Sequence, residues 1–394
     1  MTSSAFSQDF QQLRGSEAAF SQAEFADRQT RARAALQASG QEAIIVSGPE
    51  TIYWLTGRQT AGYFAFQALI LPAEGEPTLL VRQLELFGTV ANTWLEEIVA
   101  YQDGENPVDA LISLVLAKKI RKPAIELGGW FLSPRVATEI AERLNAGELF
   151  DGSHILPPLR MLKSAAELDA VRSAARYAEA GIIAGIDACM AGRDENAVAA
   201  AMLFAATQAG SEAMAMEPLV SSGPRSGLPH MTWRRRTLCA DDPIFLELAG
   251  SHARYHAALM RTVWLGTPPV EAQRMMDCSL HALDAALAAI RPGVACCVPH
   301  NAAQKVIDDA GYTAAFRKRI GYSMGVAFAP DWGEGAILSL FADVSRPIEA
   351  GMVFHLPATL RSYGHWTVGA SETVIVTDEG AEPLSSMPRS LTIR

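Results

Sequence analysis

The 394-residue chain lacks the features that would point to a membrane protein, a zinc protein or a nucleic-acid-binding protein. No apolar run reaches about eighteen residues, so the sequence predicts no transmembrane helix. Only five cysteines are present and none has CxxC spacing, so we expect buried, reduced thiols. The net charge is −10, which disfavours nucleic acid because phosphates attract clustered basic side chains.

One basic run, Arg234 to Arg236, interrupts this acidic balance, and Arg225 lies upstream of it. The run is typical of a solvated turn before a strand. One of these arginines could instead hold a carboxylate of a substrate or of a partner subunit, since guanidinium groups bind carboxylates through paired hydrogen bonds. Arg225 therefore remains a candidate substrate-binding residue.

Composition and length predict a globular protein of two domains. Apolar residues make up 49% of the chain and charged residues 19%, which is incompatible with general disorder. A chain of this length can bury two separate hydrophobic cores. The segment from Met1 to Gln12 has no signal-peptide pattern, so we expect a cytoplasmic location.

The first 158 residues alternate short apolar runs with helical stretches, which predicts an α/β domain. Ser21 and Glu24 form a capping-box pattern before a helix that ends near Gly40. The expected strands are 43–46, 68–71, 78–81, 97–101 and 123–127, with a helix over 108–118.

Residues 159–394 are predicted to form an α+β domain with a duplicated ααββ unit. Ser164 and Glu167 form a second capping box, and Asp194 opens another helix. Later helices are expected at 270–290 and before Gly311. The expected strands are 242–250, 255–266, 352–356 and 372–377.

Motifs of this second domain resemble, in order and spacing, the pita-bread fold of the creatinase and prolidase superfamily. The resemblance implies a two-domain enzyme that forms a homodimer, in which one subunit's first domain borders the other subunit's pocket. The motifs are Ser222-Gly223 followed by His230, Phe245–Gly250, Arg254–His256, Gly321–Gly325, Glu349–Val353 and Ser371–Thr377.

The peptidases of this superfamily bind two metal ions with two Asp, one His and two Glu. Carried over position by position, these ligands fall on Glu247, Ala258, Tyr322, Pro357 and Ser371. Ala, Pro and Ser cannot supply the anionic or imidazole ligands that a dication needs. The resemblance therefore implies no metal and no other cofactor.

Creatinase is a metal-free relative, but its guanidinium-binding carboxylates fall here on Met260 and Pro357, which argues against creatine. The run from Ser222 to Arg225, together with Ala329 to Glu334, resembles the metal-free ectoine hydrolase branch instead. This resemblance implies hydrolysis of a C–N bond in a small cyclic amidine such as ectoine or hydroxyectoine.

Glu247 and His230 are the expected catalytic residues. Glu247 interrupts a nearly continuous apolar strand, so its carboxylate must be neutral, paired or facing a cleft. It could attack an amidinium carbon, or it could form a buried ion pair with Arg261. His230 lies at the superfamily's proton-transfer position and suits protonating a leaving nitrogen and activating water. The expected substrate-binding residues are Trp233, Tyr255, Tyr322, Trp332, Glu334, His355 and Arg225.

Three other functions compete with this interpretation. The protein could be another metal-free amidine or amide hydrolase, or a catalytically silent binding protein with the same fold. A metallopeptidase would require ligands that the sequence lacks. The presence of both His230 and Glu247 favours an enzyme.

Overall fold

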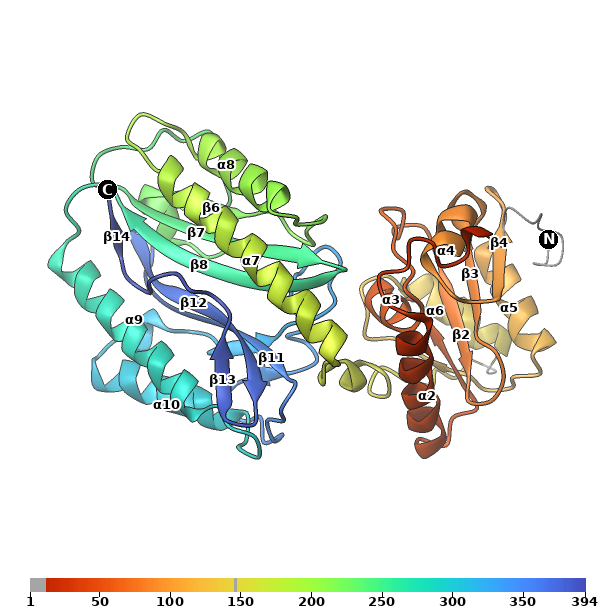
Figure 1. The fold of residues 1–394 in the computed structure, drawn as a ribbon. Coiled ribbons are helices and arrows are strands. Elements are labelled where there is room, and N and C mark those ends of the chain that lie inside the picture. The colour runs from red at the N-terminus through yellow and green to blue at the C-terminus, as the bar shows by residue number, and fades with distance from the viewer. Residues whose placement is uncertain (1–11, 145–146) are drawn as a thin grey trace. The chain divides into compact units, whose positions relative to one another are not determined.

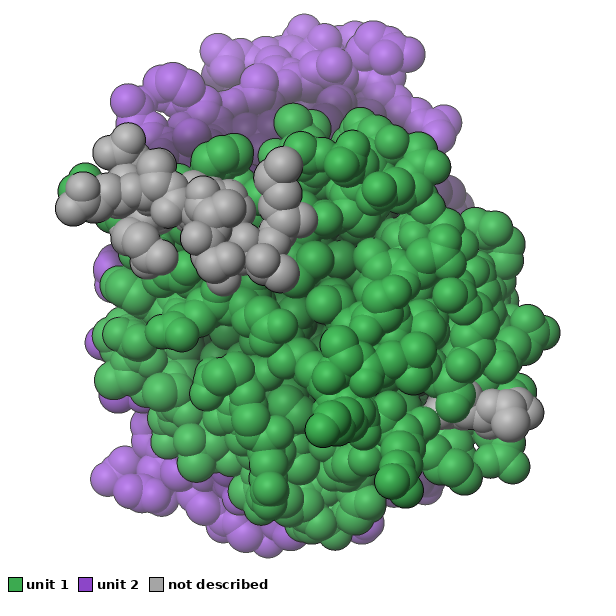
Figure 2. Space-filling view, turned by 90° about the vertical axis from the view of Figure 1, so that its right-hand side faces the viewer, with its two compact units in different colours: residues 1–160 green, residues 161–394 purple. Residues whose placement is uncertain are grey.

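The computed structural model describes residues 12–144 and 147–394 of the chain. Two compact units are present, unit 1 from Met1 to Arg160 and unit 2 from Met161 to Arg394 (Figure 2). The expected boundary near residue 158 falls just before this division. The segment Met1 to Gln12, on which the expected cytoplasmic location rests, lies almost entirely outside the described residues. In the described part of the chain, no helix combines the length and apolarity needed to cross a bilayer.

Unit 1 is the expected α/β domain, built on one mixed sheet with the strand order β4-β3-β2-β1-β5. Strands β1, β2 and β3 are antiparallel neighbours, whereas β4 and β5 pair in parallel at the two edges. The elements are α2 (Gln22–Ala38), β1 (Ala43–Val46), α3 (Pro49–Thr56), β2 (Ala68–Pro72), β3 (Thr78–Arg82), α4 (Leu86–Asn92), β4 (Glu97–Tyr101), α5 (Pro107–Ala117), β5 (Ala124–Ile125) and α6 (Pro134–Leu144).

Unit 2 contains the expected duplicated ααββ arrangement. Its first half comprises α7 (Ala165–Ala188), α8 (Glu195–Gln208), β6 (Leu219–Ser222), the short 3₁₀ helix η4 (Gly223–Gly227), β7 (Pro243–His252) and β8 (Tyr255–Trp264). Its second half comprises α9 (Val270–Ala289), α10 (Cys297–Asp309), β9 (Gly321–Ser323), β10 (Ser339–Leu340), β11 (Val353–Ser362), β12 (Trp366–Thr377), β13 (Gly380–Pro383) and β14 (Thr392–Ile393).

Each half of unit 2 packs a helix against one face of its sheet. Figure 1 shows α7 lying along β7 and β8, and α9 packs against β11 and β12. The Ser164 side chain accepts a hydrogen bond from the Glu167 backbone, and the Glu167 carboxylate accepts one in return, which completes the predicted capping box of α7. The strand orders are β14-β8-β7-β6 and β10-β9-β11-β12-β13.

Alternation along the strands separates an apolar face from a polar one. Leu246 and Leu248 of β7 belong to the hydrophobic core shared with α7 and α8. Glu247 lies between them and points to the opposite face, because successive side chains alternate across a strand. Its direct partner across the ladder is Met260 of β8. Burial of the leucine face thus fixes the direction in which Glu247 points.

Hydrogen bonds between β8 and β12 join the two sheets. The Thr373 hydroxyl accepts from the Ala258 backbone N–H at 3.0 Å and donates to the Ala258 carbonyl at 2.8 Å. The Thr262 hydroxyl donates to the Gly369 carbonyl at 3.0 Å. These threonines bring the polar faces of both sheets into one interior.

Replacing Thr373 tests this junction. Thr373→Val removes the hydroxyl and leaves a buried N–H and carbonyl of Ala258 without their partner, which should lower the free energy of unfolding by about 2–4 kcal/mol. Thr373→Ser keeps both hydrogen bonds and loses one methyl group, at about 1 kcal/mol. Urea unfolding of the two variants measures the difference, and equal stability of the two would show that the hydrogen bonds do not matter.

Candidate functional site

Glu247 lies in the interior between the two sheets, with 8% of its surface exposed. The expected alternative, an ion pair with Arg261, is wrong, because Arg261 donates to Glu372 at 3.0 Å. Among the described residues, none forms an ion pair with Glu247 within 4.0 Å. Burial raises the pKa of Glu247 to about 7, and the charges of Lys318 and Arg361 oppose the rise.

Two basic side chains converge beside Glu247. Lys318 lies just before β9, and its ammonium donates to the Thr359 hydroxyl at 2.6 Å. Arg361 of β11 donates to the same hydroxyl at 3.4 Å. Burial, followed by the neighbouring charge of Arg361, lowers the pKa of Lys318 to about 7. The polar interior therefore holds one carboxyl group and two basic side chains whose charges act on it.

A chain of hydrogen bonds occupies the other side of this interior. Trp332 donates through its indole N–H to the Tyr322 hydroxyl at 3.0 Å. The Tyr322 hydroxyl lies 2.9 Å from Nδ1 of His355, and Nε2 of His355 lies 2.7 Å from the Ser371 hydroxyl. Burial lowers the pKa of His355 to about 3, so the ring is neutral. A neutral ring that accepts from Tyr322 donates to Ser371, which satisfies every member of the chain.

Three of the expected pocket residues, Tyr322, Trp332 and His355, are thus brought together by the fold. The charge of Glu247 adds to the burial that raises the pKa of Tyr322. The guanidinium of Arg319 stacks over the Tyr322 ring at 4.8 Å. Tyr322 therefore links the hydrogen-bond chain to the charged cluster.

The loop that carries His230 is fastened by a fully buried carboxylate, Glu195. Glu195 accepts hydrogen bonds from the Ser222 backbone N–H at 2.9 Å and from the Arg234 backbone N–H at 2.8 Å. Arg225 donates to both of its oxygens, at 2.7 and 2.6 Å. Arg225 thus holds a carboxylate of its own chain and helps to fasten the loop, whereas its expected substrate-binding role stays a prediction.

His230 itself is exposed on this loop and has a left-handed backbone conformation, with φ of 55°. The start of the loop is packed tightly against the turn between β11 and β12. A Cβ atom at Gly227 would lie 2.6 Å from the His365 nitrogen and 2.7 Å from the Ser362 carbonyl, so only glycine fits there. The loop is therefore anchored next to the end of β11 that carries Arg361. The catalytic role of His230 stays a prediction.

The remaining expected substrate-binding residues make contacts within the protein. The Tyr255 hydroxyl donates to the carboxylate of Glu167 on α7. Glu334 pairs with Lys163 at 3.0 Å, with both side chains buried. Trp233 is half-buried against the hydrophobic core of the first half of unit 2. These contacts are sufficient to explain all three residues structurally.

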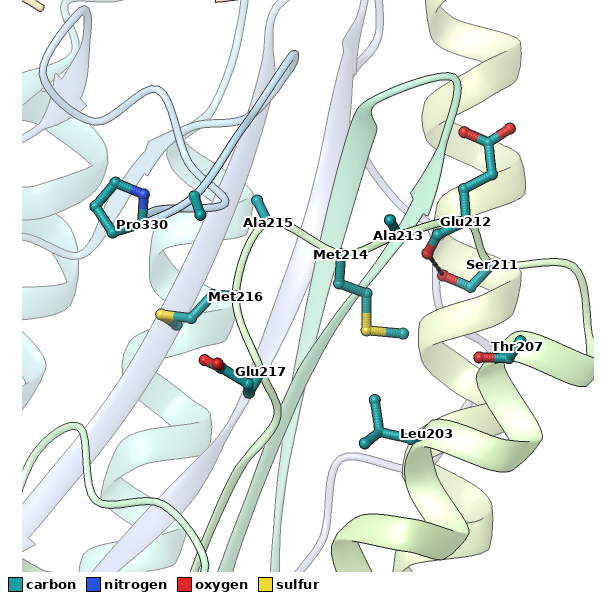
Figure 3. A pocket seen from close by; sticks show the side chains of 11 residues that line it. Leu203, Thr207, Ser211, Glu212, Ala213, Met214, Ala215, Met216, Glu217 and Pro330 are labelled. Carbon is teal, nitrogen blue, oxygen red and sulfur yellow. Dashed lines mark hydrogen bonds between the residues drawn. The ribbon is translucent and has the colours of Figure 1, made fainter. Parts of the chain in front are cut away.

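A pocket of about 740 Å³ lies beside α8 (Figure 3). In the figure, Met214 points toward Leu203 of α8, whereas Met216 and Glu217 lie nearer to Pro330. The Ala215 N–H of the pocket loop donates to His256 at 3.0 Å. The loop then continues into β6, whose Leu219 pairs with Glu247. The pocket was not predicted from the sequence. Its lining contains none of the expected catalytic or substrate-binding residues.

Lys318, Thr359 and Arg361 were not predicted from the sequence. The strand expected at 352–356 continues in the structure, as β11, to Ser362. Pro357 hid the continuation, because proline is rare inside sheets, but β9 pairs with β11 only at Phe354 and His355. A period of two from His355 places Thr359 and Arg361 on the same face, and this was the available signal. No comparable signal marks Lys318, which lies in a loop.

Comparison with known proteins identifies the family. The profile described as "Metallopeptidase family M24" matches residues 169–378. The chain belongs to this family. The profile described as "Creatinase/Prolidase N-terminal domain" matches residues 28–162, so the expected superfamily and the two-domain fold class are confirmed.

Several relatives of this M24 protein match over nearly their whole length. Ectoine hydrolase of Halomonas elongata is 25% identical, with 95% of this chain and 98% of the relative covered. The crystal structure of dipeptidase PepE from Mycobacterium ulcerans is 26% identical, covers 95% of this chain and 99% of its own, and has a TM-score of 0.82. Recombinant prolidase from Thermococcus sibiricus shares the fold at 22% identity, with 94% and 99% covered and a TM-score of 0.85.

The family name implies metal ions, but the residues of this M24 chain do not fit them. Of the five ligand positions only Glu247 carries a carboxylate, and Tyr322 and Ser371 are engaged in the hydrogen-bond chain. Lys318 and Arg361 would repel a dication placed beside Glu247. In residues 12–144 and 147–394, no three His, Cys, Asp or Glu side chains gather as metal ligands do.

The pKa of Glu247 predicts how stability depends on pH. Its folded value of about 7 lies above the ordinary 4.5, so the neutral carboxyl stabilises the fold below pH 4.5 and this contribution is lost as the pH rises through 7. Glu247→Gln, neutral at every pH, should match the wild type near pH 4 and exceed its free energy of unfolding above pH 7 by on the order of 2–3 kcal/mol. Urea unfolding between pH 4 and 8 measures this.

Glu382→Gln is the matched control. Its ion pair with Arg172 lowers the pKa of Glu382, so the ionised carboxylate stabilises the fold above its unfolded pKa and loses this effect as the pH falls. This substitution should therefore destabilise the protein slightly near pH 7. A Glu247→Gln variant that is less stable than the wild type above pH 7 would contradict the raised pKa.

Proposed function

We propose that this M24-family hydrolase opens a C–N bond of a small cyclic amidine, such as ectoine or hydroxyectoine, without a metal ion. The observation that carries the proposal is the state of Glu247. It is a buried carboxylate without a close ion pair, at a position where relatives bind metal, and its pKa is near neutrality. Similarity to ectoine hydrolase over nearly the whole chain supports the choice of substrate.

Glu247 acts as the nucleophile in this proposal. An amidinium group that binds beside it favours the ionised carboxylate, because an opposite charge nearby lowers a carboxyl pKa. The ionised oxygen attacks the amidinium carbon and forms a covalent adduct as the ring C–N bond breaks. The apolar residues around β7 keep bulk water away from the attacking oxygen.

His230 supplies the proton transfers. It gives a proton to the ring nitrogen as that nitrogen leaves, and it then takes a proton from the water that hydrolyses the adduct. Its position on an exposed loop means that the loop must bring the ring to the bound substrate. The anchor at Glu195 and Arg225 limits how far the loop can move.

Glu334 and Glu372 are weaker candidates for the nucleophile. Glu334 is paired with Lys163, and Glu372 with Arg261, so each carboxylate already has a buried cationic partner of its own. A binding protein without activity is the second candidate function, since the N-terminal domain of the FACT complex subunit SPT16 from chickpea shares the fold at a TM-score of 0.72. The unpaired state of Glu247 favours the enzyme, because a buried carboxylate without a role costs stability. We propose assembly as a homodimer, as the resemblance implies.

Activity of two variants tests the assignment. Glu247→Gln keeps the shape and removes the nucleophile, so ectoine turnover should fall by roughly three or more orders of magnitude. His230→Ala should lower turnover by roughly 10²- to 10⁴-fold and allow a covalent adduct to accumulate. Intact-protein mass spectrometry detects the adduct, and peptide mapping should place it on Glu247. Glu349→Gln, which removes a half-buried carboxylate of unit 2 that pairs with Arg346, is the control and should leave turnover unchanged.

Near-normal turnover in Glu247→Gln would show that the nucleophile is a different residue. A wild-type protein that turns over neither ectoine, hydroxyectoine nor a related amidine would favour the binding protein.

Removal of metal tests the second part of the proposal. Purified protein should contain no stoichiometric Mn, Co, Zn or Fe, because the ligand positions lack donors and hold cations nearby. Dialysis against a chelator should leave ectoine turnover intact. Near-integer metal by elemental analysis, lost together with activity on chelation, would refute metal independence.

A further inference from the structure

Lys318 and Arg361 raise a difficulty for a substrate that carries only positive charge. The charges of both side chains act on the carboxylate that is proposed to receive an amidinium group, so they would also repel that group in a partly buried site. We infer that Lys318 and Arg361, held together by Thr359, bind a carboxylate of the substrate, so that the substrate is a zwitterion with an amidinium at Glu247 and a carboxylate at this pair. This inference rests on the proposed function and specifies its substrate class.

The arrangement of the two side chains suits the binding of an anion. Both donate to the single hydroxyl of Thr359, at 2.6 Å from Lys318 and 3.4 Å from Arg361, so their charged groups are close to each other. Two cations that share one neutral acceptor repel each other unless an anion lies between them. Thr359 is almost fully buried and fixes where they meet.

One hydrogen-bond donor of Arg361 has no partner among the described residues. Its Nε atom is buried and makes no hydrogen bond to any described residue. A buried donor without a partner costs about 1–3 kcal/mol in a folded protein, so such atoms mark places where a ligand or water completes the structure. A guanidinium binds a carboxylate through two parallel N–H groups, and a free Nε leaves one such edge available.

The presence of Lys318 and Arg361 is not explained by ion pairing with Glu247. Neither lies within 4.0 Å of its carboxylate among the described residues, although ion pairs elsewhere in unit 2 close to about 3 Å. Arg319 adds a third positive charge that acts on Lys318. Asp331 is exposed, and its charge acts on Tyr322. The interior therefore carries an excess of positive charge that one further anion would balance.

Two cyclic amidines that differ only in the carboxylate test the inference. Ectoine carries it, and 2-methyl-1,4,5,6-tetrahydropyrimidine is the same ring without it. Binding is measured by titration calorimetry on the Glu247→Gln protein, so that turnover does not interfere, with and without Arg361→Gln. The second substitution should weaken ectoine binding by about 10- to 100-fold and leave the binding of the carboxylate-free ring within about twofold.

Three further variants sharpen the result. Lys318→Gln should weaken ectoine in the same selective manner, and Arg361→Lys should recover part of the lost affinity because it restores the charge. Arg317→Gln removes an exposed arginine next to Lys318 and should change neither ligand. Equal loss of both ligands in Arg361→Gln, or no loss of ectoine, would overturn the inference.

A separate measurement distinguishes failure of the site from failure of the proposed function. Acetate, a carboxylate without an amidinium, should bind the wild-type protein at low ionic strength and should lose this binding in Arg361→Gln but not in Arg317→Gln. That pattern supports the anion site even when no amidine is hydrolysed. Ectoine turnover by a protein whose acetate and ectoine binding are both indifferent to Arg361 would uphold the proposed function and refute the anion site.

Discussion

The hydrogen bonds between β8 and β12 are the constraint on which the site depends. Thr373 and Thr262 hold the two sheets so close that the polar faces of β7 and β11 share one interior. Glu247 comes from the first half of the duplicated fold, whereas Lys318 and Arg361 come from the second. Neither half contains the charge arrangement alone. Burial at the junction of the halves raises the pKa of Glu247 and lowers that of Lys318, and the charges of Lys318 and Arg361 oppose the rise at Glu247.

Such an interior is costly, and the cores on either side offset the cost. A buried carboxyl group without a close partner makes the folded protein less stable than an apolar residue at the same position would. The outer faces of both sheets bury large apolar clusters against α7, α8 and α9, and that burial supplies far more free energy than one strained charge removes. Elsewhere in unit 2, buried charges are paired directly, as Arg261 is with Glu372 and Lys163 with Glu334. The contrast supports the role proposed for Glu247.

The sequence predicted the local structure well wherever a short-range pattern determined it. Capping residues such as Ser164 and Asp194 set the helix starts, and apolar runs marked most strands within a few residues. Glu247 could be identified because its distance from Ala258 along the chain matches a family motif. The pairing of Arg225 with Glu195 could not be predicted, because Glu195 lies thirty residues earlier and only the fold brings the two together. Lys318 gave no signal, since a charged loop residue is usually solvated and its burial depends on distant strands.

In the proposed function, side chains take the place of a metal site, which changes the charge that the site can accept. A pair of dications attracts anionic groups of a substrate from one place, whereas here the positive charge is divided between Lys318 and Arg361 and lies opposite a carboxylate. A site with separated charges of both signs favours a ligand whose own charges are separated by a matching distance. It also discriminates against purely cationic or purely anionic ligands, because each would place one of its ends against a like charge. Tyr322 and Ser371 form hydrogen bonds with His355. These two positions therefore shape the interior but bring no charge to it. The selectivity proposed for this protein therefore follows from where the charges remain after the metal ligands have been replaced.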